Sequence, residues 1–417
     1  MSLLAIIFFS LALFVALSYL RKQSDLFSPA RLFIIIWAII IGLTELKLSW
    51  LQKEWETYSW AMILISLSAM LLGMFSVYVL NFNKTFNSIN NIKEVLTNDN
   101  YESKRIFKVV LYLFFAYIIS YSVIYLTVGF IPLFTNDPNS ARTKWSIFGF
   151  GLIIHAAPAV IYFALLYYLF IKKKMATKLV LALIILITLF TFILLLQRFT
   201  IVITIVLLLV MLYYGTKKFK GSYLLAISSA FVLLVYSIST IRTSKFFILY
   251  LYNEAKMKFD ESLAFLTEPY MYLVMNLENF ANGVKQYDAY TYGYFTFDFI
   301  LALTGLKHPI AKASNFAEFP FIVNKSFNTY SMFFVYYRDF GVFGLLIFPF
   351  IIGFSISTIY YWMRKNPSIH SISVYGMCVF VILFTFFIPL LSWLHFVMNI
   401  SIIYFLSKYL KNKKSNA

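Results

Sequence analysis

The sequence predicts an all-α polytopic integral membrane protein with about 11 transmembrane helices and one large extracytoplasmic loop. Of its 417 residues, 61% are hydrophobic and only 12% are charged, about half the charged fraction of an ordinary soluble domain. Apolar runs of about 20 residues recur along the chain, which is the length at which a helix crosses a bilayer. Lys and Arg gather in alternate loops between these runs, as the positive-inside rule requires.

The apolar runs divide the chain into three parts. Residues 1–242 hold eight predicted transmembrane helices, 243–332 form the large loop, and 333–417 hold three more helices and a basic tail. The predicted spans are 2–20, 31–48, 58–80, 106–129, 147–171, 177–196, 199–214, 221–241, 333–361, 371–390 and 392–409.

The basic residues also predict the orientation. Clusters such as Lys172–Lys174 and the Lys-rich tail follow odd-numbered spans, and loops rich in Lys and Arg stay in the cytoplasm. The loop 243–332, which follows the eighth span, is therefore predicted to be extracytoplasmic.

Three function classes are excluded or made improbable by composition. The net charge of +18 is spread over short loops, so no separate basic domain exists to bind nucleic acid. The single cysteine, Cys378, excludes a disulfide within the chain and a thiolate zinc site. No two of the four histidines have metal-ligand spacing. We therefore expect neither a metal nor a cofactor.

The large loop is rich in aromatic residues. Its 90 residues include 21 Phe or Tyr. The first half, Thr243–Val284, mixes aromatic, aliphatic and charged residues in a way that suits helices lying in the membrane interface. The second half carries turn residues, including Gly293 and Gly305. Two interpretations stay open: an aromatic belt at the headgroup level, or a cleft in which sugar rings stack on aromatic faces.

Four arginines fall on the predicted outer side of the membrane: Arg142, Arg198, Arg242 and Arg338. Arginine beside the hydrocarbon is costly and usually has a functional partner, although its side chain can also snorkel to the interface. Its planar fork binds phosphate oxygens bidentately. Convergent arginines at the outer leaflet would suit the pyrophosphate of a lipid-linked substrate.

Two residues are candidates for a catalytic base. Asp339 lies just inside the ninth predicted span, beside Arg338, where an acid must be paired or functional. His308 is the only histidine in the large loop and could accept a proton. The alternatives are a local ion pair for Asp339 and a structural role for His308.

These residues resemble a known family. About eleven spans, one large loop before the last three, Arg198 in a short outer loop, Asn328-Thr329-Tyr330, Asp339-Phe340-Gly341 and Gly344 look like the Wzy-type oligosaccharide repeat-unit polymerases, or O-antigen polymerases. The O-antigen ligases share the general plan. The ligase branch carries a histidine near the position of Asn328, so its absence here favours a polymerase.

The resemblance implies a bacterial, GT-C-like, metal-independent glycosyltransferase of the cytoplasmic membrane. Such an enzyme joins oligosaccharide repeats on undecaprenyl pyrophosphate into a surface polysaccharide, such as O-antigen or capsule, at the outer membrane face. Arg198 would bind the donor pyrophosphate together with the other outer arginines. Asn328 and Tyr330 would position the acceptor hydroxyl. The family also implies a chain-length-regulating membrane partner.

Other function classes remain open from the sequence. A lipid-linked glycan flippase or another transporter usually has short loops and visible internal repetition, which the 90-residue loop disfavours. A membrane acyltransferase usually carries a catalytic histidine inside a span, and only His155 lies in such a position.

Overall fold

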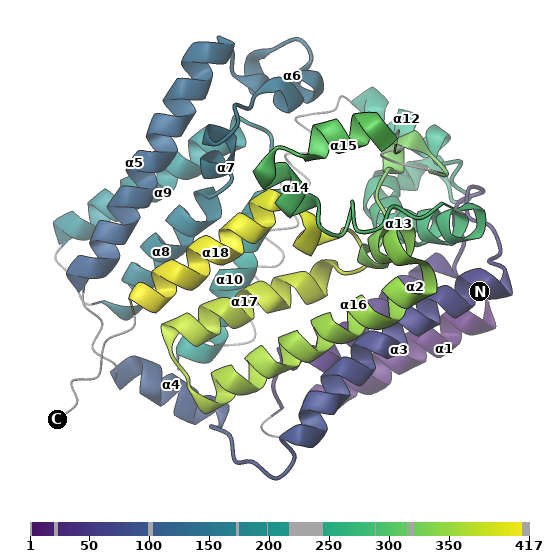
Figure 1. The fold of residues 1–417 in the computed structure, drawn as a ribbon, viewed down its shortest axis with the longest axis horizontal. Coiled ribbons are helices and arrows are strands. Elements are labelled where there is room, and N and C mark those ends of the chain that lie inside the picture. The colour runs from purple at the N-terminus through teal and green to yellow at the C-terminus, as the bar shows by residue number, and fades with distance from the viewer. Residues whose placement is uncertain are drawn as a thin grey trace. The chain divides into compact units, whose positions relative to one another are not determined.

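The computed structural model describes residues 2–20, 24–98, 103–171, 175–197, 199–216, 245–287, 289–314, 316 and 321–410. These residues form helices, and the described part of the chain contains no strand beyond the isolated bridge between Ser49 and Met257. The all-α class is therefore confirmed. The chain divides into two compact units (Figure 1).

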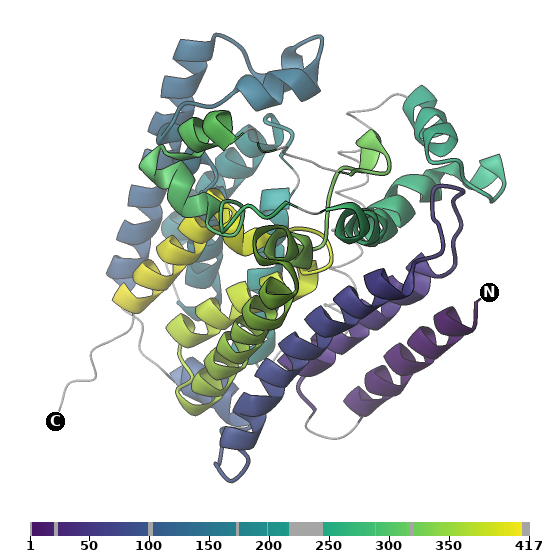
Figure 2. The same cartoon turned by 45° about the vertical axis from the view of Figure 1, so that its right-hand side comes forward.

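The first unit comprises Met1–Phe86, Thr243–Trp362 and Val381–Val397. Its helices are α1 (Leu3–Leu17), α2 (Pro29–Thr44), α3 (Thr57–Leu80), α12 (Lys245–Glu254), α13 (Thr267–Gln286), α14 (Asp298–Thr304), α15 (Lys307–Ser314) and most of α16 (Met332–Lys365). Helix α1 packs on α2, and α13 packs on α2 and α3. Helices α2, α3 and α16 lie side by side (Figures 1 and 2). Trp37 of α2 stacks on Phe333 of α16 with ring centres 5.2 Å apart.

The second unit comprises Asn87–Arg242, Met363–Phe380 and Met398–Ala417. Its helices are α4 (Ile89–Asn98), α5 (Ser103–Val128), α6 (Pro138–Lys144), α7 (Phe150–Ile154), α8 (Ala157–Phe170), α9 (Met175–Ile193), α10 (Phe199–Gly215) and most of α17 (Ile369–Phe384) and α18 (Leu394–Tyr409). Helix α8 is buried along most of its length and packs against α5, α9 and α10. The Tyr162 and Ser373 hydroxyls of α8 and α17 share a hydrogen bond of 2.7 Å.

Helices lie at most of the predicted spans that the structure describes. Among the described residues, six stretches are long and apolar enough to cross a membrane: Leu3–Leu20, Thr57–Leu80, Ser103–Phe134, Phe150–Phe170, Met175–Ile193 and Met332–Lys365. Helices α2, α10, α17 and α18 are shorter, with 16 or 17 residues each. The predicted span 221–241 lies outside the described residues. Membrane-spanning helices are thus supported, while the count of eleven stays a prediction.

The predicted span 147–171 contains a break. Helix α7 ends at Ile154, and α8 begins at Ala157 with Pro158 in its first turn. Proline lacks the backbone N–H that a continuous helix would use, and it suits the first turn of a new one. The proline therefore explains why two helices replace the single one expected.

The first half of the large loop is helical, as expected, but α13 is not a helix with one free apolar face. Most of its residues are buried. Met271, Val274 and Met275 join Leu251 of α12 and Ala255, the residue after α12, in an apolar cluster. The aromatic and aliphatic residues of this half are thus used to dock the loop helices onto the ends of α2 and α3.

Within the first unit, the segments predicted to be extracytoplasmic lie together. Ser49, which follows α2, donates to the carbonyl of Ala255, and Tyr58 at the start of α3 bonds to Tyr337 at the start of α16. At the opposite end of the same helices, Asp25 accepts from Tyr360. These contacts join helix ends within the first unit, while the topology of the loop in the membrane stays a prediction.

Candidate functional site

The candidate site lies at the start of α16, which is two helices joined at Gly341. This glycine has φ 61° and ψ −142°, so it interrupts the helix. A Cβ there would lie 2.7 Å from the Tyr290 hydroxyl, and the left-handed φ favours glycine. The segment after Gly341 is about 36 Å long, enough to cross a hydrocarbon layer of about 30 Å. The short segment before Gly341 carries Arg338 and Asp339.

Asp339 is completely buried, and loop donors surround its carboxylate. One oxygen, Oδ1, accepts from the Thr291 hydroxyl and from the backbone N–H of Phe295 at 3.3 Å. The other, Oδ2, accepts from the backbone N–H of Thr296 at 2.5 Å. The backbone adds two more bonds, because Thr291 and Tyr292 donate to the carbonyls of Arg338 and Asp339. Asp339 therefore ties the loop 291–296 to α16.

Arg338 is 4% exposed and lies among aromatic rings. Its guanidinium carbon is 3.4 Å from the centre of the Phe295 ring and 5.7 Å from that of Tyr287. Its Nε donates to the Tyr287 hydroxyl at 3.4 Å. A cation over aromatic faces is stabilised by the ring quadrupole. The guanidinium thus lies over the Phe295 ring, whereas its N–H donors, which bind anions, point outward in the plane of the group.

Two hydroxyls beside this cluster have unused hydrogen-bonding capacity. Thr296 Oγ1 and Ser331 Oγ are buried, and neither has a hydrogen-bond partner within the described part of the chain. Thr296 follows Phe295, and Ser331 precedes the first residue of α16. Buried polar atoms are normally paired, so an ordered water or a bound ligand could use this capacity.

Residues 327–330, which lead into α16, are held by two asparagines of α13. Asn279 donates to the carbonyls of Phe327 and Thr329, both at 2.8 Å. Thr329 donates its hydroxyl to Asn276 Oδ1. Tyr330 is buried and stacks on Phe334 with ring centres 4.4 Å apart, whereas the Asn328 side chain is exposed. Of the two predicted acceptor-binding residues, only Asn328 therefore presents its side chain to the surroundings.

The other predicted site residues belong to other segments of the chain. His308 is exposed on α15 of the first unit. Arg142 belongs to α6 of the second unit and is partly exposed. Arg198 and Arg242 lie outside the described residues. Of the candidates, the structure brings together Arg338, Asp339 and Tyr330.

The sequence interpretation missed the aromatic partners of Arg338 and a buried carboxyl group. Glu278 of α13 is 4% exposed. Its Oε2 accepts from Trp55 Nε1 at 3.1 Å, and burial raises its pKa to about 7. Glu45, at the end of α2, is also buried. The signal for Glu278 was its position in the apolar stretch Tyr272–Phe280, where a charge must be paired or neutralised.

The described residues contain no group of three or more His, Cys, Asp and Glu side chains that could hold a metal ion. The chain matches no family model, no curated protein and no solved structure.

Proposed function

We propose that this chain is a membrane glycosyltransferase that joins lipid-pyrophosphate-linked oligosaccharide repeat units into a polysaccharide at the outer face of the bacterial cytoplasmic membrane. The observation that carries the proposal is Arg338. This arginine is buried among aromatic rings at the start of a helix whose remainder is apolar and long enough to span a membrane.

The arrangement suits an amphiphilic substrate. A buried arginine is expensive unless its charge is used, and its planar fork fits phosphate oxygens better than a point charge does. The rings of Tyr287, Phe295 and Tyr330 lie around this cation and offer stacking faces for sugars. The sugar and the phosphate could then bind within this cluster, while the hydrocarbon lies along the membrane-spanning part of α16.

The phosphate would bind the edge of the guanidinium, where the N–H donors lie, while the Phe295 ring stays against the guanidinium. The backbone N–H of Phe295 is bonded to Asp339, which holds this ring in place. In this proposal Asp339 is a positioning residue, because both of its oxygens are already engaged by Thr291, Phe295 and Thr296.

In the proposed reaction, the bond between the donor's anomeric carbon and the phosphate oxygen breaks. A bond forms between that carbon and an acceptor hydroxyl oxygen, and the hydroxyl proton passes to a base. Arg338 stabilises the charge that develops on the departing lipid pyrophosphate. Arg142, Arg198 and Arg242 remain proposed additional phosphate ligands. Asn328 remains a proposed contact for the acceptor, and the exposed His308 remains the candidate base.

The test uses the full chain, purified and reconstituted with lipid-linked repeat units. Formation of a polymer ladder together with released lipid pyrophosphate is expected for the wild type. Arg338→Ala should abolish the ladder, whereas Arg364→Ala, at the other end of α16, should retain it. Movement of the lipid-linked repeats across the membrane without any ladder would indicate a flippase and contradict the proposal.

A further inference from the structure

Helices α3 and α16 approach each other closely at a pair of glycines. A Cβ on Gly73 would clash with the backbone carbonyl oxygen of Phe350, and a Cβ on Gly353 would clash with that of Met70. Glycines at such positions let two membrane helices approach backbone to backbone. This contact, the Gly73–Gly353 crossing, fixes the separation of the two helices.

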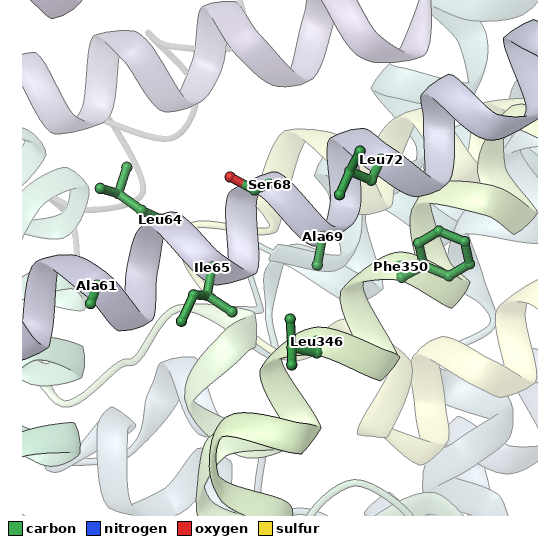
Figure 3. A pocket seen from close by; sticks show the side chains of 8 residues that line it. All are labelled: Ala61, Leu64, Ile65, Ser68, Ala69, Leu72, Leu346 and Phe350. Atoms are coloured by element: carbon green, nitrogen blue, oxygen red, sulfur yellow. The ribbon is translucent and has the colours of Figure 1, made fainter.

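On the N-terminal side of the crossing, the two helices leave a hollow of 440 Å3. Ile65 and Ala69 of α3 point toward the turns of α16 that carry Leu346 and Phe350 (Figure 3). The remaining wall is formed by Ala61, Leu64, Leu72 and Ser68, the only polar residue of the set. This volume falls within the range of small-molecule sites, roughly 300–1,000 Å3. We call the hollow the α3–α16 groove.

The chemistry of the α3–α16 groove fits a hydrocarbon chain. Both of its walls are helices apolar and long enough to cross a membrane. Leu64, Leu72, Leu346 and Phe350 are also exposed, so the groove opens to the surroundings at a depth occupied by lipid. A chain bound there gains packing and a fixed position, because free lipid tails are as apolar as the groove itself.

The groove continues toward the candidate site. At the start of both helices, the hydroxyls of Tyr58 and Tyr337 lie 3.0 Å apart, and the next residue of α16 is Arg338. On α3, Ala61 of the groove follows Tyr58 by about 4.5 Å along the helix axis. The cation, the tyrosine hydroxyls and the apolar groove therefore lie in the same order as the polar head and the apolar chain of a phosphorylated lipid.

We propose that the α3–α16 groove holds the isoprenoid chain of the lipid-linked substrate while Arg338 binds its phosphate. This inference rests on the proposed function, which supplies the substrate. The groove would contribute to catalysis by orienting the headgroup, since a positioned substrate reacts faster than a freely diffusing one.

The experiment uses a photoreactive polyprenyl pyrophosphate in nanodiscs of phosphatidylglycerol that contain the full chain. Mass spectrometry should locate the label on peptides of α3 and α16 near Leu64 and Leu346. Excess unlabelled polyprenyl pyrophosphate should reduce the labelling about tenfold, the effect of a competitor in excess over its Kd, and additional phospholipid should not. Ala61→Phe and Ala69→Leu, which fill the groove, should lose the label. Val79→Phe, exposed elsewhere on α3, should keep it.

Equal competition by phosphatidylglycerol would mean that the groove collects bulk lipid only, which would overturn the inference. Unchanged labelling of both filled variants, with normal melting temperatures, would do the same. The assay needs neither acceptor nor turnover. A labelled groove in a chain that forms no polymer would therefore refute the proposed function alone, and polymer formation with the label elsewhere would refute the groove alone.

Discussion

The guanidinium carbon of Arg338 lies 3.4 Å from the centre of the Phe295 ring, and the backbone N–H of Phe295 donates to Asp339, the next residue after that arginine. One loop residue is thus held by α16 through its backbone and packs its ring against α16's buried cation. The loop 291–296 is therefore both anchored to α16 and the source of an aromatic ring that supports the guanidinium.

Removal of the Phe295 ring should loosen the arginine. Phe295→Ala eliminates a ring whose interaction with the cation is worth about 0.5–2 kcal/mol, so the guanidinium is held less firmly in place. We expect the lipid pyrophosphate to bind about twofold to tenfold more weakly, as measured by equilibrium binding in nanodiscs. Phe297→Ala, which follows the loop and faces Phe348, is the control. Equal or tighter binding by Phe295→Ala would mean that the ring does not position Arg338 for the ligand.

Asp339→Asn should reduce stability. The amide places an NH2 group where a carboxylate oxygen now accepts a hydrogen bond, so at least one buried donor among Thr291, Phe295 and Thr296 loses its partner. The cost is about 1–3 kcal/mol, visible as a lower melting temperature. Asp137→Asn is the control, because asparagine caps α6 as well as aspartate does. If the variant has normal stability and binds the donor but does not turn it over, Asp339 acts as the catalytic base instead.

Glu278 predicts a pH dependence of stability. Its pKa is raised from 4.5 to about 7, chiefly by burial, with opposing contributions from Trp55 and Lys47 and a small reinforcing one from Glu45. The folded chain therefore binds this proton more tightly than the unfolded chain does. Stability from this group is complete below pH 4.5 and is lost as the pH rises through 7, by at most about 3 kcal/mol.

Thermal unfolding between pH 5 and 8 tests this prediction. Glu278→Gln should flatten the loss of stability toward high pH, while Glu254→Gln, exposed on α12, should leave the wild-type profile unchanged. An unaltered profile in Glu278→Gln would show that the carboxyl is ionised throughout this range.

The predicted sidedness can be tested with two introduced cysteines in a chain whose Cys378 is replaced by alanine. Ser262→Cys lies in the large loop, and Lys84→Cys follows α3; both positions are exposed. The distribution of basic residues predicts that an impermeant maleimide labels Ser262→Cys in intact cells and labels Lys84→Cys only after lysis. The reverse pattern would invert the topology and place the site of Arg338 in the cytoplasm.

Much of the helical framework could be predicted from local sequence. Apolar runs located α3 and α16 within a few residues, because a membrane-crossing helix needs only length and hydrophobicity. The break between α7 and α8 was missed, although Pro158 was visible in the sequence. The break at Gly341 is harder to predict from the sequence, because it depends on the neighbouring Tyr290.

The candidate site could be predicted from the sequence only in part, for the same reason. Arg338 and Asp339 could be selected because charges near an apolar run are costly. Their partners could not, because Tyr287 and Phe295 lie more than forty positions away in the sequence and meet α16 only after the loop has docked. The burial of Glu278 likewise depends on Trp55, which comes from the segment between α2 and α3.

The most direct test of the central claim is the rate of polymer formation by Arg338→Lys on purified lipid-linked repeat units. Lysine keeps the charge but loses the planar fork. The loss of one charge-assisted hydrogen bond, about 1.5–3 kcal/mol, corresponds to a rate about tenfold to a hundredfold lower. Arg364→Lys should retain the wild-type rate, and both variants should melt normally. Wild-type rates in Arg338→Lys would show that Arg338 does not grip the donor phosphate and would contradict the account.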